Sequence, residues 1–236
     1  MTTPDGVSLE SGGAIRNARG AAGSVGFLAV RLDTGGAVLV TTHHVAFGNG
    51  GAAAEPVWLA DTHSGRARRV GRAAYGREGT VRSRDGDVWI DAAVVDLDDG
   101  LLRAADCALA ASSAADHDSL IVAAGDVVTA IGAASGLAEG RVVDIAFDDR
   151  IRVGGRMRNA PRQLLVRSAV RGHPFMRGGD SGAALRNARG TIVGLLWGTT
   201  PRGDGIACPI APVLEILHVR AATVTPGPVP RRARAS

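Results

Sequence analysis

The feature that most constrains the fold is a succession of short apolar runs separated by glycine, aspartate and asparagine. Glycine accounts for 33 of the 236 residues, and only 3% of the residues are aromatic. Short runs bounded by turn-forming residues are typical of strands rather than helices. We predict strands over 25–32, 38–42, 88–97, 120–131, 141–147, 162–170 and 191–198. The chain is therefore expected to be all-β, and its length suffices for one domain with a substantial core.

The string Gly178-Gly179-Asp180-Ser181-Gly182 predicts an activated serine. A serine hydroxyl attacks a carbonyl only when a base takes its proton and preorganised donors stabilise the oxyanion that forms. Gly179 has no Cβ and adopts a positive φ at little cost, so its N–H and that of Ser181 can converge beside the hydroxyl. The string predicts Ser181 as a nucleophile, with an oxyanion hole formed by Gly179 and Ser181.

A serine nucleophile needs a histidine that acts as its base, and the chain has six histidines. Two of them, His43 and His44, follow the predicted strand 38–42, and the end of a strand can hold a base rigidly. The other four lie in polar stretches or near the end of an apolar helical pattern, and we interpret them as surface or satisfied residues: His63, His117, His173 and His218.

The candidate carboxylate is Asp91, which interrupts the apolar run 88–95. An ionised carboxylate among apolar neighbours is costly unless a hydrogen bond or an opposite charge compensates it, and an imidazole is a suitable partner. The remaining acids of this region lie in polar flanks and are expected to be solvated: Asp85, Asp87, Asp96, Asp98 and Asp99.

Three blocks together resemble the signatures of the trypsin-like (chymotrypsin-fold) serine peptidases of bacterial type. They are 40–45, 91–95 and 179–182, in the order histidine, aspartate, serine. The position of the histidine within its family block selects His44 over His43. The glycine pattern of 127–143 and the stretches 191–198 and 205–210 are similar to second-barrel strands of that family.

The resemblance implies two six-stranded antiparallel β-barrels and a short C-terminal helix. It places the peptidase domain at 23–219, after an N-terminal extension over 1–22. Within the domain the expected parts are a first barrel at about 23–115, a second barrel at about 120–212 and a helix at about 211–219. The apolar positions 213, 214, 216 and 217 fit that helix. Residues 220–236 are expected to be a flexible Pro/Arg-rich tail.

The activity that the resemblance implies is hydrolysis of peptide bonds in a protein or peptide substrate. Ser181 attacks the carbonyl, His44 accepts and returns the proton, Asp91 fixes the imidazole tautomer, and water releases the acyl-enzyme. No cofactor is implied. The alternative is a catalytically silent homologue that acts as a protein-binding module.

The resemblance also assigns a substrate pocket. Phe175, six residues before the nucleophile, is its expected base, and Trp197, Gly198 and Gly205 are its expected walls. An apolar base predicts small or medium apolar side chains before the cleaved bond, because it offers no carboxylate to neutralise lysine or arginine.

Many secreted relatives are activated when a freed apolar N-terminus inserts beside the aspartate that precedes the nucleophile. Ile15 is followed by Arg16-Asn17, which does not resemble such a terminus. Asp180 is therefore expected to make internal contacts, with the chain active without cleavage. The alternative is a regulatory protein partner that orders the loop 172–180.

The remaining composition excludes several function classes. All 27 basic residues are arginine and the formal net charge is +4, but with so few aromatic side chains nucleic-acid binding is disfavoured. No Cys/His cluster has zinc spacing, and Cys107 and Cys208 can form one disulfide at most. No apolar stretch approaches a membrane span. The start lacks the basic and apolar regions of a secretory signal, so the expected location is cytoplasmic.

Overall fold

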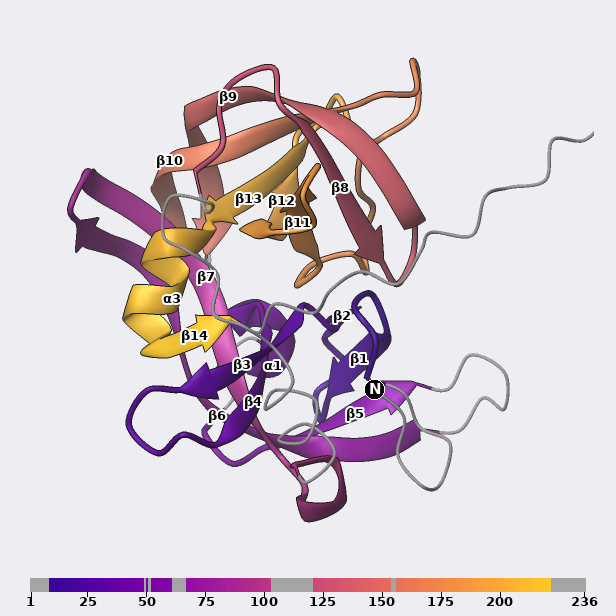
Figure 1. Cartoon of the computed structure of the whole chain (residues 1–236), viewed down its shortest axis with the longest axis vertical. Helices are drawn as coiled ribbons and strands as arrows, with labels where there is room; N and C mark the ends of the chain where they lie inside the picture. Colours follow the sequence, from indigo (N-terminus) through magenta and orange to yellow (C-terminus); the bar gives the residue numbers. More distant parts are fainter. Residues whose placement is uncertain are drawn as a thin grey trace, which may run out of the picture.

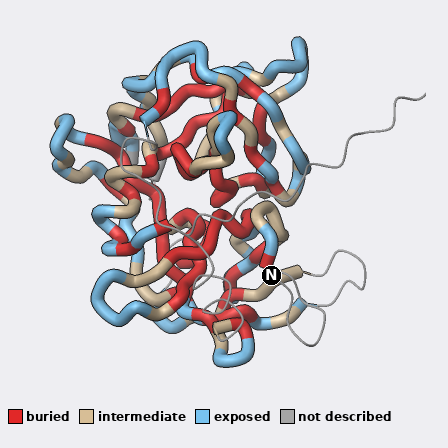
Figure 2. Tube along the Cα trace, viewed as in Figure 1, coloured by how far each residue is buried: buried red, intermediate tan, exposed pale blue. Residues whose placement is uncertain are grey.

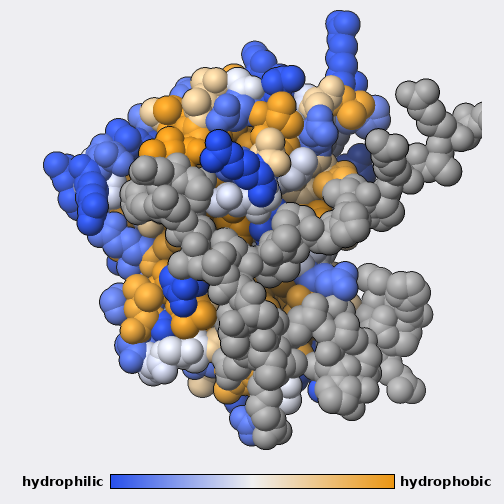
Figure 3. Space-filling model, viewed as in Figure 1, coloured by the Kyte–Doolittle hydropathy of each residue, from blue (hydrophilic) through white to orange (hydrophobic). Residues whose placement is uncertain are grey.

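A computed structural model of the chain describes residues 9–48, 50, 52–60, 67–102, 121–153 and 156–221. Two units of antiparallel strands lie one above the other, the first built from the N-terminal half together with one strand near the C-terminal end, and the second from the C-terminal half (Figure 1). Buried residues run through the centre of both units and across their junction (Figure 2). In the visible face of Figure 3, apolar side chains are interspersed with hydrophilic ones.

The first unit is an eight-stranded sheet with the order β14-β3-β4-β7-β6-β5-β1-β2. The strand over Ala37–Thr41 is buried on both faces, since alternate residues enter two different apolar clusters: Val38 and Val40 face one, Ala37 and Leu39 the other. Period-two alternation produces this division. The bounds are β1 Ala14–Asn17, β2 Ala22–Ser24, β3 Phe27–Arg31, β4 Ala37–Thr41, β5 Pro56–Ala60, β6 Ala67–Ser83, β7 Gly86–Leu97 and β14 Val219–Ala221, with the short helix α1 over His43–Ala46.

The second unit is a closed six-stranded barrel with the order β10-β13-β12-β11-β8-β9. Its interior is filled by apolar side chains that include Val128, Leu164, Phe175, Leu185 and Leu196. The strands are β8 Val127–Gly132, β9 Gly136–Val153, β10 Arg156–Ser168, β11 Ala184–Asn187, β12 Ile192–Thr199 and β13 Gly205–Pro209. Closure leaves this unit without an unpaired edge.

The two units share one apolar cluster, which combines Val40 and Val94 of the first sheet with Leu195 and Cys208 of the barrel. Helix α3, Ile210–Leu217, contributes Ile210, Val213 and Leu217 to it and lies against β7. This helix ends at His218, whose φ of 51° is the left-handed conformation common at helix C-termini. The junction therefore has a packed core of its own.

The prediction of an all-β, two-unit fold with a C-terminal helix is confirmed, but its boundaries differ. Residues 14–17 lie within the expected extension 1–22, yet they form β1, because Ile15 packs in the core at 1% exposure, and β2 begins at residue 22, the last of that extension. Strand β14 occupies the start of the expected tail and pairs with β3. As a result the described part of the first unit has eight strands rather than six. Of the expected tail, residues 222–236 lie outside the described part of the chain.

No helix in the described ranges is both long enough and apolar enough to cross a lipid bilayer.

Candidate active site

Two hydrogen bonds join His44 to Asp91 at the junction between the units. The His44 Nδ1 lies 2.5 Å from Oδ2 of Asp91, and the His44 backbone N–H donates to Oδ1 at 3.1 Å. Helix α1 starts directly after β4, and β4 pairs with β7, the strand that carries Asp91. The sheet thereby brings the two residues together, as the apolar surroundings of Asp91 predicted.

The environment of His44 determines which of its nitrogens can take a proton. Burial by itself lowers the pKa of His44, but the hydrogen bond and the charge of Asp91, together with the charge of Glu78, raise it above its usual value. Asp91 is 3% exposed, and an ionised carboxylate can only accept, so Nδ1 carries the hydrogen. Nε2 is then the nitrogen that is free to accept a proton.

His43, the other histidine at this strand end, has a different environment. Its ring stacks on Phe47 with centroids 4.7 Å apart, and its buried Nδ1 has no hydrogen-bond partner among the described residues. Burial lowers the pKa of His43. The structure therefore separates two histidines that local sequence reasoning alone left equivalent.

The loop around Ser181 has the conformation that its glycines predicted. Gly179 has a φ of 102° and Gly182 a φ of 94°. The N–H groups of Asp180 and Gly182 donate to Arg177 and Leu196, whereas those of Gly179 and Ser181 make no hydrogen bond within the described part of the chain. The N–H groups of Gly179 and of Ser181 itself are thus available as donors, and an oxyanion hole requires such donors beside the nucleophile.

The Ser181 backbone and helix α1 both lie against Gly23 of strand β2. A Cβ on Gly23 would collide both with the Val45 side chain and with the carbonyl oxygen of Ser181, so these groups adjoin at strand β2. The Ser181 hydroxyl donates to the carbonyl of Trp197 at 3.4 Å, and across the described ranges no hydrogen bond joins it to His44. Hydrogen bonds between base and nucleophile are often long without substrate and shorten when it binds.

Asp180 is buried at 1% exposure and accepts four hydrogen bonds from within the chain. Its Oδ1 accepts from the N–H groups of Ala134 and Ser135 at 2.9 and 3.0 Å. Its Oδ2 accepts from the Ser135 hydroxyl at 2.6 Å and the Arg177 N–H at 2.7 Å. The expectation of internal contacts for Asp180 is confirmed.

The residue expected at the base of the pocket, Phe175, is buried at 1% exposure. Its ring lies between Gly140 and Gly205, where a Cβ would come within 2.8 and 2.6 Å of ring atoms. Among the expected wall residues, Trp197 is half-buried and donates from Nε1 to Gln163 at 2.7 Å. Phe175 is therefore packed in the barrel interior. The small hollow beside its ring is lined by Ser135, Asp180 and apolar barrel residues, and not by the expected walls Trp197, Gly198 and Gly205.

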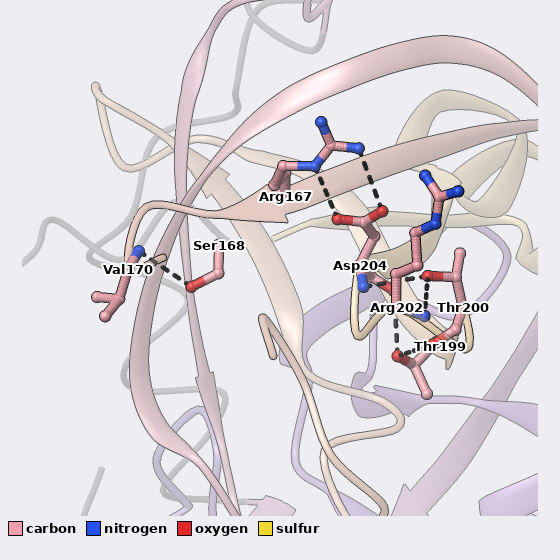
Figure 4. A network of polar contacts seen from close by, with 7 residues as sticks. All are labelled: Arg167, Ser168, Val170, Thr199, Thr200, Arg202 and Asp204. Atoms are coloured by element: carbon pink, nitrogen blue, oxygen red, sulfur yellow. Dashed lines mark hydrogen bonds and ion pairs between the residues drawn. The ribbon is translucent and has the colours of Figure 1, made fainter. Parts of the chain in front are cut away.

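Figure 4 shows the polar network that fixes the turn between β12 and β13, which ends at Gly205. Asp204 accepts from Arg167 Nε at 3.1 Å, and its N–H donates to the hydroxyl of Thr200 at 3.2 Å. Thr199 donates to the Asp204 carbonyl at 3.1 Å. The Phe175 N–H donates to Gly203 in the same turn, so one network positions both Gly205 and Phe175.

Cys208 is a buried free thiol behind Asp91, and its Sγ accepts the Asp91 N–H at 3.3 Å. Burial raises the pKa of Cys208 well above its usual range, which keeps the thiol neutral. Cys107, His63 and His117 lie outside the described residues. In the parts that the structure describes, no three His, Cys, Asp or Glu side chains group as metal ligands would.

Glu78 is a site residue that the sequence did not reveal. It lies in β6 directly opposite Asp91 in β7, and opposite residues of an antiparallel pair project from the same face. Burial and the charge of Asp91 raise the pKa of Glu78, while the charges of His44 and Arg158 lower it. A second carboxyl group therefore flanks the histidine. The polar, glycine-rich composition of β6 gave no sign of a strand.

We expect Glu78→Gln to lower the pKa of His44, because the variant removes a negative charge that favours the imidazolium. NMR titration of the His44 ring measures this directly. Glu139→Gln, at an exposed position on β9, is the matched control and should leave the titration unchanged. An unchanged His44 titration in Glu78→Gln would show that Glu78 does not act on the histidine.

No protein-family model matches the chain, and no curated protein sequence does. Many solved structures match the chain, among them three that cover nearly all of it. Thermobifida fusca protease A has a TM-score of 0.58 at 16% identity, covering 92% of this chain and 100% of that one. Cellulomonas bogoriensis chymotrypsin has 0.56 at 17% identity, covering 92% and 99%. A glutamic-acid-specific serine protease, described as using a histidine triad in substrate binding, has 0.56 at 19% identity, covering 89% and 98%.

The chain therefore has the fold of the trypsin-like, chymotrypsin-fold bacterial serine proteases. At these identities the likeness establishes the fold alone.

Proposed function

We propose that this protein is a serine endopeptidase that hydrolyses peptide bonds in proteins or peptides through an acyl-enzyme intermediate. The observation that carries the proposal is the pair of hydrogen bonds between His44 and Asp91, at 2.5 and 3.1 Å, beside the serine loop. The Asp91 side chain is 4% exposed, which strengthens its interaction with the imidazole, while the His44 side chain is 34% exposed and remains accessible.

In the proposed mechanism, the Ser181 hydroxyl attacks the substrate carbonyl as His44 Nε2 takes its proton. Asp91 stabilises the imidazolium and holds Nδ1–H toward itself. The N–H groups of Gly179 and Ser181 donate to the oxyanion. His44 then gives its proton to the leaving amine. In the second half of the reaction, water gives a proton to His44 and attacks the acyl-enzyme, and His44 returns that proton to Ser181 as the acid product is released.

The experiment that tests the proposal is labelling with a serine-directed phosphonate, followed by mass spectrometry of the modified peptide. We expect one adduct, on Ser181, and none in Ser181→Ala. A wild-type protein that folds but remains unlabelled would contradict the proposal. Peptide binding without labelling would instead support the alternative of a silent homologue that binds proteins.

We propose that the pocket beside Phe175 accepts small or medium apolar side chains. The carboxylate beside this ring, Asp180, already accepts four hydrogen bonds, so a charged side chain placed there would lose its hydration without gaining a free ionic partner. Peptides with alanine or valine before the cleaved bond should therefore exceed those with arginine or lysine by at least about tenfold in kcat/KM, the scale of pocket discrimination. Cleavage mapping across a peptide library measures this, and strict cleavage after arginine or lysine would contradict it.

A further inference from the structure

Ser24 ends β2, the edge strand of the first sheet, and is completely buried against the nucleophile loop of the second unit. All of its hydrogen-bonding atoms are used. Its N–H donates to the Ser181 carbonyl at 2.7 Å, and its own carbonyl accepts from the Thr41 hydroxyl at 3.0 Å. Its hydroxyl donates to the Gly179 carbonyl and accepts the Ala133 N–H, both at 2.9 Å.

We propose that Ser24 is a positioning residue that holds the oxyanion-forming loop, fastening it to the first sheet and to the β8–β9 turn. The inference rests on the proposed function, because it assigns Ser24 a role in that same site. Ser24 touches neither the substrate nor the reacting atoms in this assignment. It acts through the backbone of Gly179 and Ser181.

The position of the Gly179 carbonyl explains why one hydroxyl matters. The peptide group between Gly179 and Asp180 lies in the chain between the N–H groups of Gly179 and Ser181, which make no hydrogen bond among the described residues. Gly179 adopts a φ of 102°, and glycine is nearly free to leave such a conformation. Contacts outside the loop must therefore fix it, and Ser24 supplies the contact to this central peptide.

The β8–β9 turn holds the same loop from the other side. Ala134 and Ser135 donate to the Asp180 carboxylate, while Ala133, the residue before them, donates to Ser24. A Cβ on Gly132 would collide with the Asp180 carboxylate, so turn and loop are in direct contact. Ser24 is thus the point at which the first sheet, the turn and the nucleophile loop meet, and every contact comes from within the chain.

Loss of the hydroxyl would leave the Gly179 carbonyl and the Ala133 N–H, both partly buried, without their Ser24 partner. Buried polar groups without partners are unfavourable, so the loop and the turn would move to find others. The two N–H groups would then spend less time in the orientation that receives an oxyanion, whereas the substrate-binding surface would be unchanged.

The test compares Ser24→Ala with Ser83→Ala. Ser83 also donates a side-chain hydrogen bond to a carbonyl, that of Gly86 at 2.7 Å, but in the β6–β7 hairpin. Amide hydrogen exchange is followed by mass spectrometry over 177–183 and 132–136, and kcat and KM are measured with a cleaved peptide. In Ser24→Ala we expect exchange in both segments to accelerate by about tenfold or more and kcat to fall about 10- to 100-fold, with KM changed less than about threefold. Ser83→Ala should match the wild type.

Unchanged exchange in a folded Ser24→Ala would overturn the inference, as would acceleration spread evenly over the whole chain. A fall in kcat/KM that came entirely from KM would also overturn it. If Ser24→Ala does not fold, Ser24→Cys provides the same test, since a thiol is a weak donor and acceptor of similar size. A wild type that is not labelled at Ser181 would refute the proposed function, while the exchange data would still decide the role of Ser24.

Discussion

Ser181→Ala is expected to lower kcat for a cleaved peptide by about four to six orders of magnitude, with KM little changed. The expected loss is large because the hydroxyl is the group that forms the covalent bond, and His44 and Asp91 have no function in attack without it. Steady-state kinetics with an active-site-titrated wild type and a variant purified separately measure the ratio. The residual rate would reflect the oxyanion donors and substrate binding alone.

The serine-to-alanine change at Ser83 is the control for this variant, and its turnover should equal that of the wild type. The fold should also survive in Ser181→Ala, since among the described residues the hydroxyl makes a single hydrogen bond, a 3.4 Å contact to the Trp197 carbonyl. A melting temperature within a few degrees of the wild type would show this. Equal turnover in wild type and Ser181→Ala would mean that Ser181 is not the nucleophile.

The parts of the site that could be predicted from sequence are those whose signal is local. Gly179 and Gly182 adopt positive φ angles because the turn requires them, and glycines on both sides of a serine predict such a turn. Asp91 is an acid within an apolar strand, and its burial at 3% exposure follows from that setting. A buried acid needs a hydrogen-bonding partner. The local sequence offered His43 and His44, and in the structure the partner is His44.

The residues that sequence reasoning missed depend on partners far away in the chain. Ser24 is a small polar residue between a glycine and a valine, and only the approach of the Ser181 loop gives it a role. Glu78 faces Asp91 because β6 pairs with β7, yet exposed arginines and glycines conceal β6 as a strand. Strand β14 is three residues long and exists because β3 offers it an edge. Contacts between segments that are distant in the sequence leave no pattern in the local sequence of either segment.

Phe175 is an intermediate case, because its sequence position and its surroundings carry different information. The distance from Ser181 in the chain places it at the expected base of the pocket, and its burial fits an apolar base. The ring is accommodated only because Gly140 on β9 and Gly205 on β13 lack side chains. Their pairing with the same strand, β10, creates that space, and the sequence alone does not show it.

Asp91→Asn is expected to lower kcat by about four orders of magnitude while the fold is retained. An amide of the same shape can still fill the buried site, but it presents either an oxygen or an NH₂ group to His44. The NH₂ group would donate to Nδ1 and move the ring hydrogen to Nε2, the nitrogen that must accept the serine proton. Asp96→Asn, on the same strand but at an exposed ion pair with Arg31, is the matched control and should change kcat less than about threefold.

Comparison of Asp91→Asn with Glu78→Gln separates two effects of negative charge on His44. Both variants remove a carboxylate that raises the pKa of the histidine, so both should move the acidic limb of the pH–rate profile to lower pH. Only Asp91 accepts from Nδ1, so only Asp91→Asn should also lower the plateau. A lowered plateau in Glu78→Gln, or a plateau within about tenfold of the wild type in Asp91→Asn, would mean that the orientation of His44 depends on something other than Asp91.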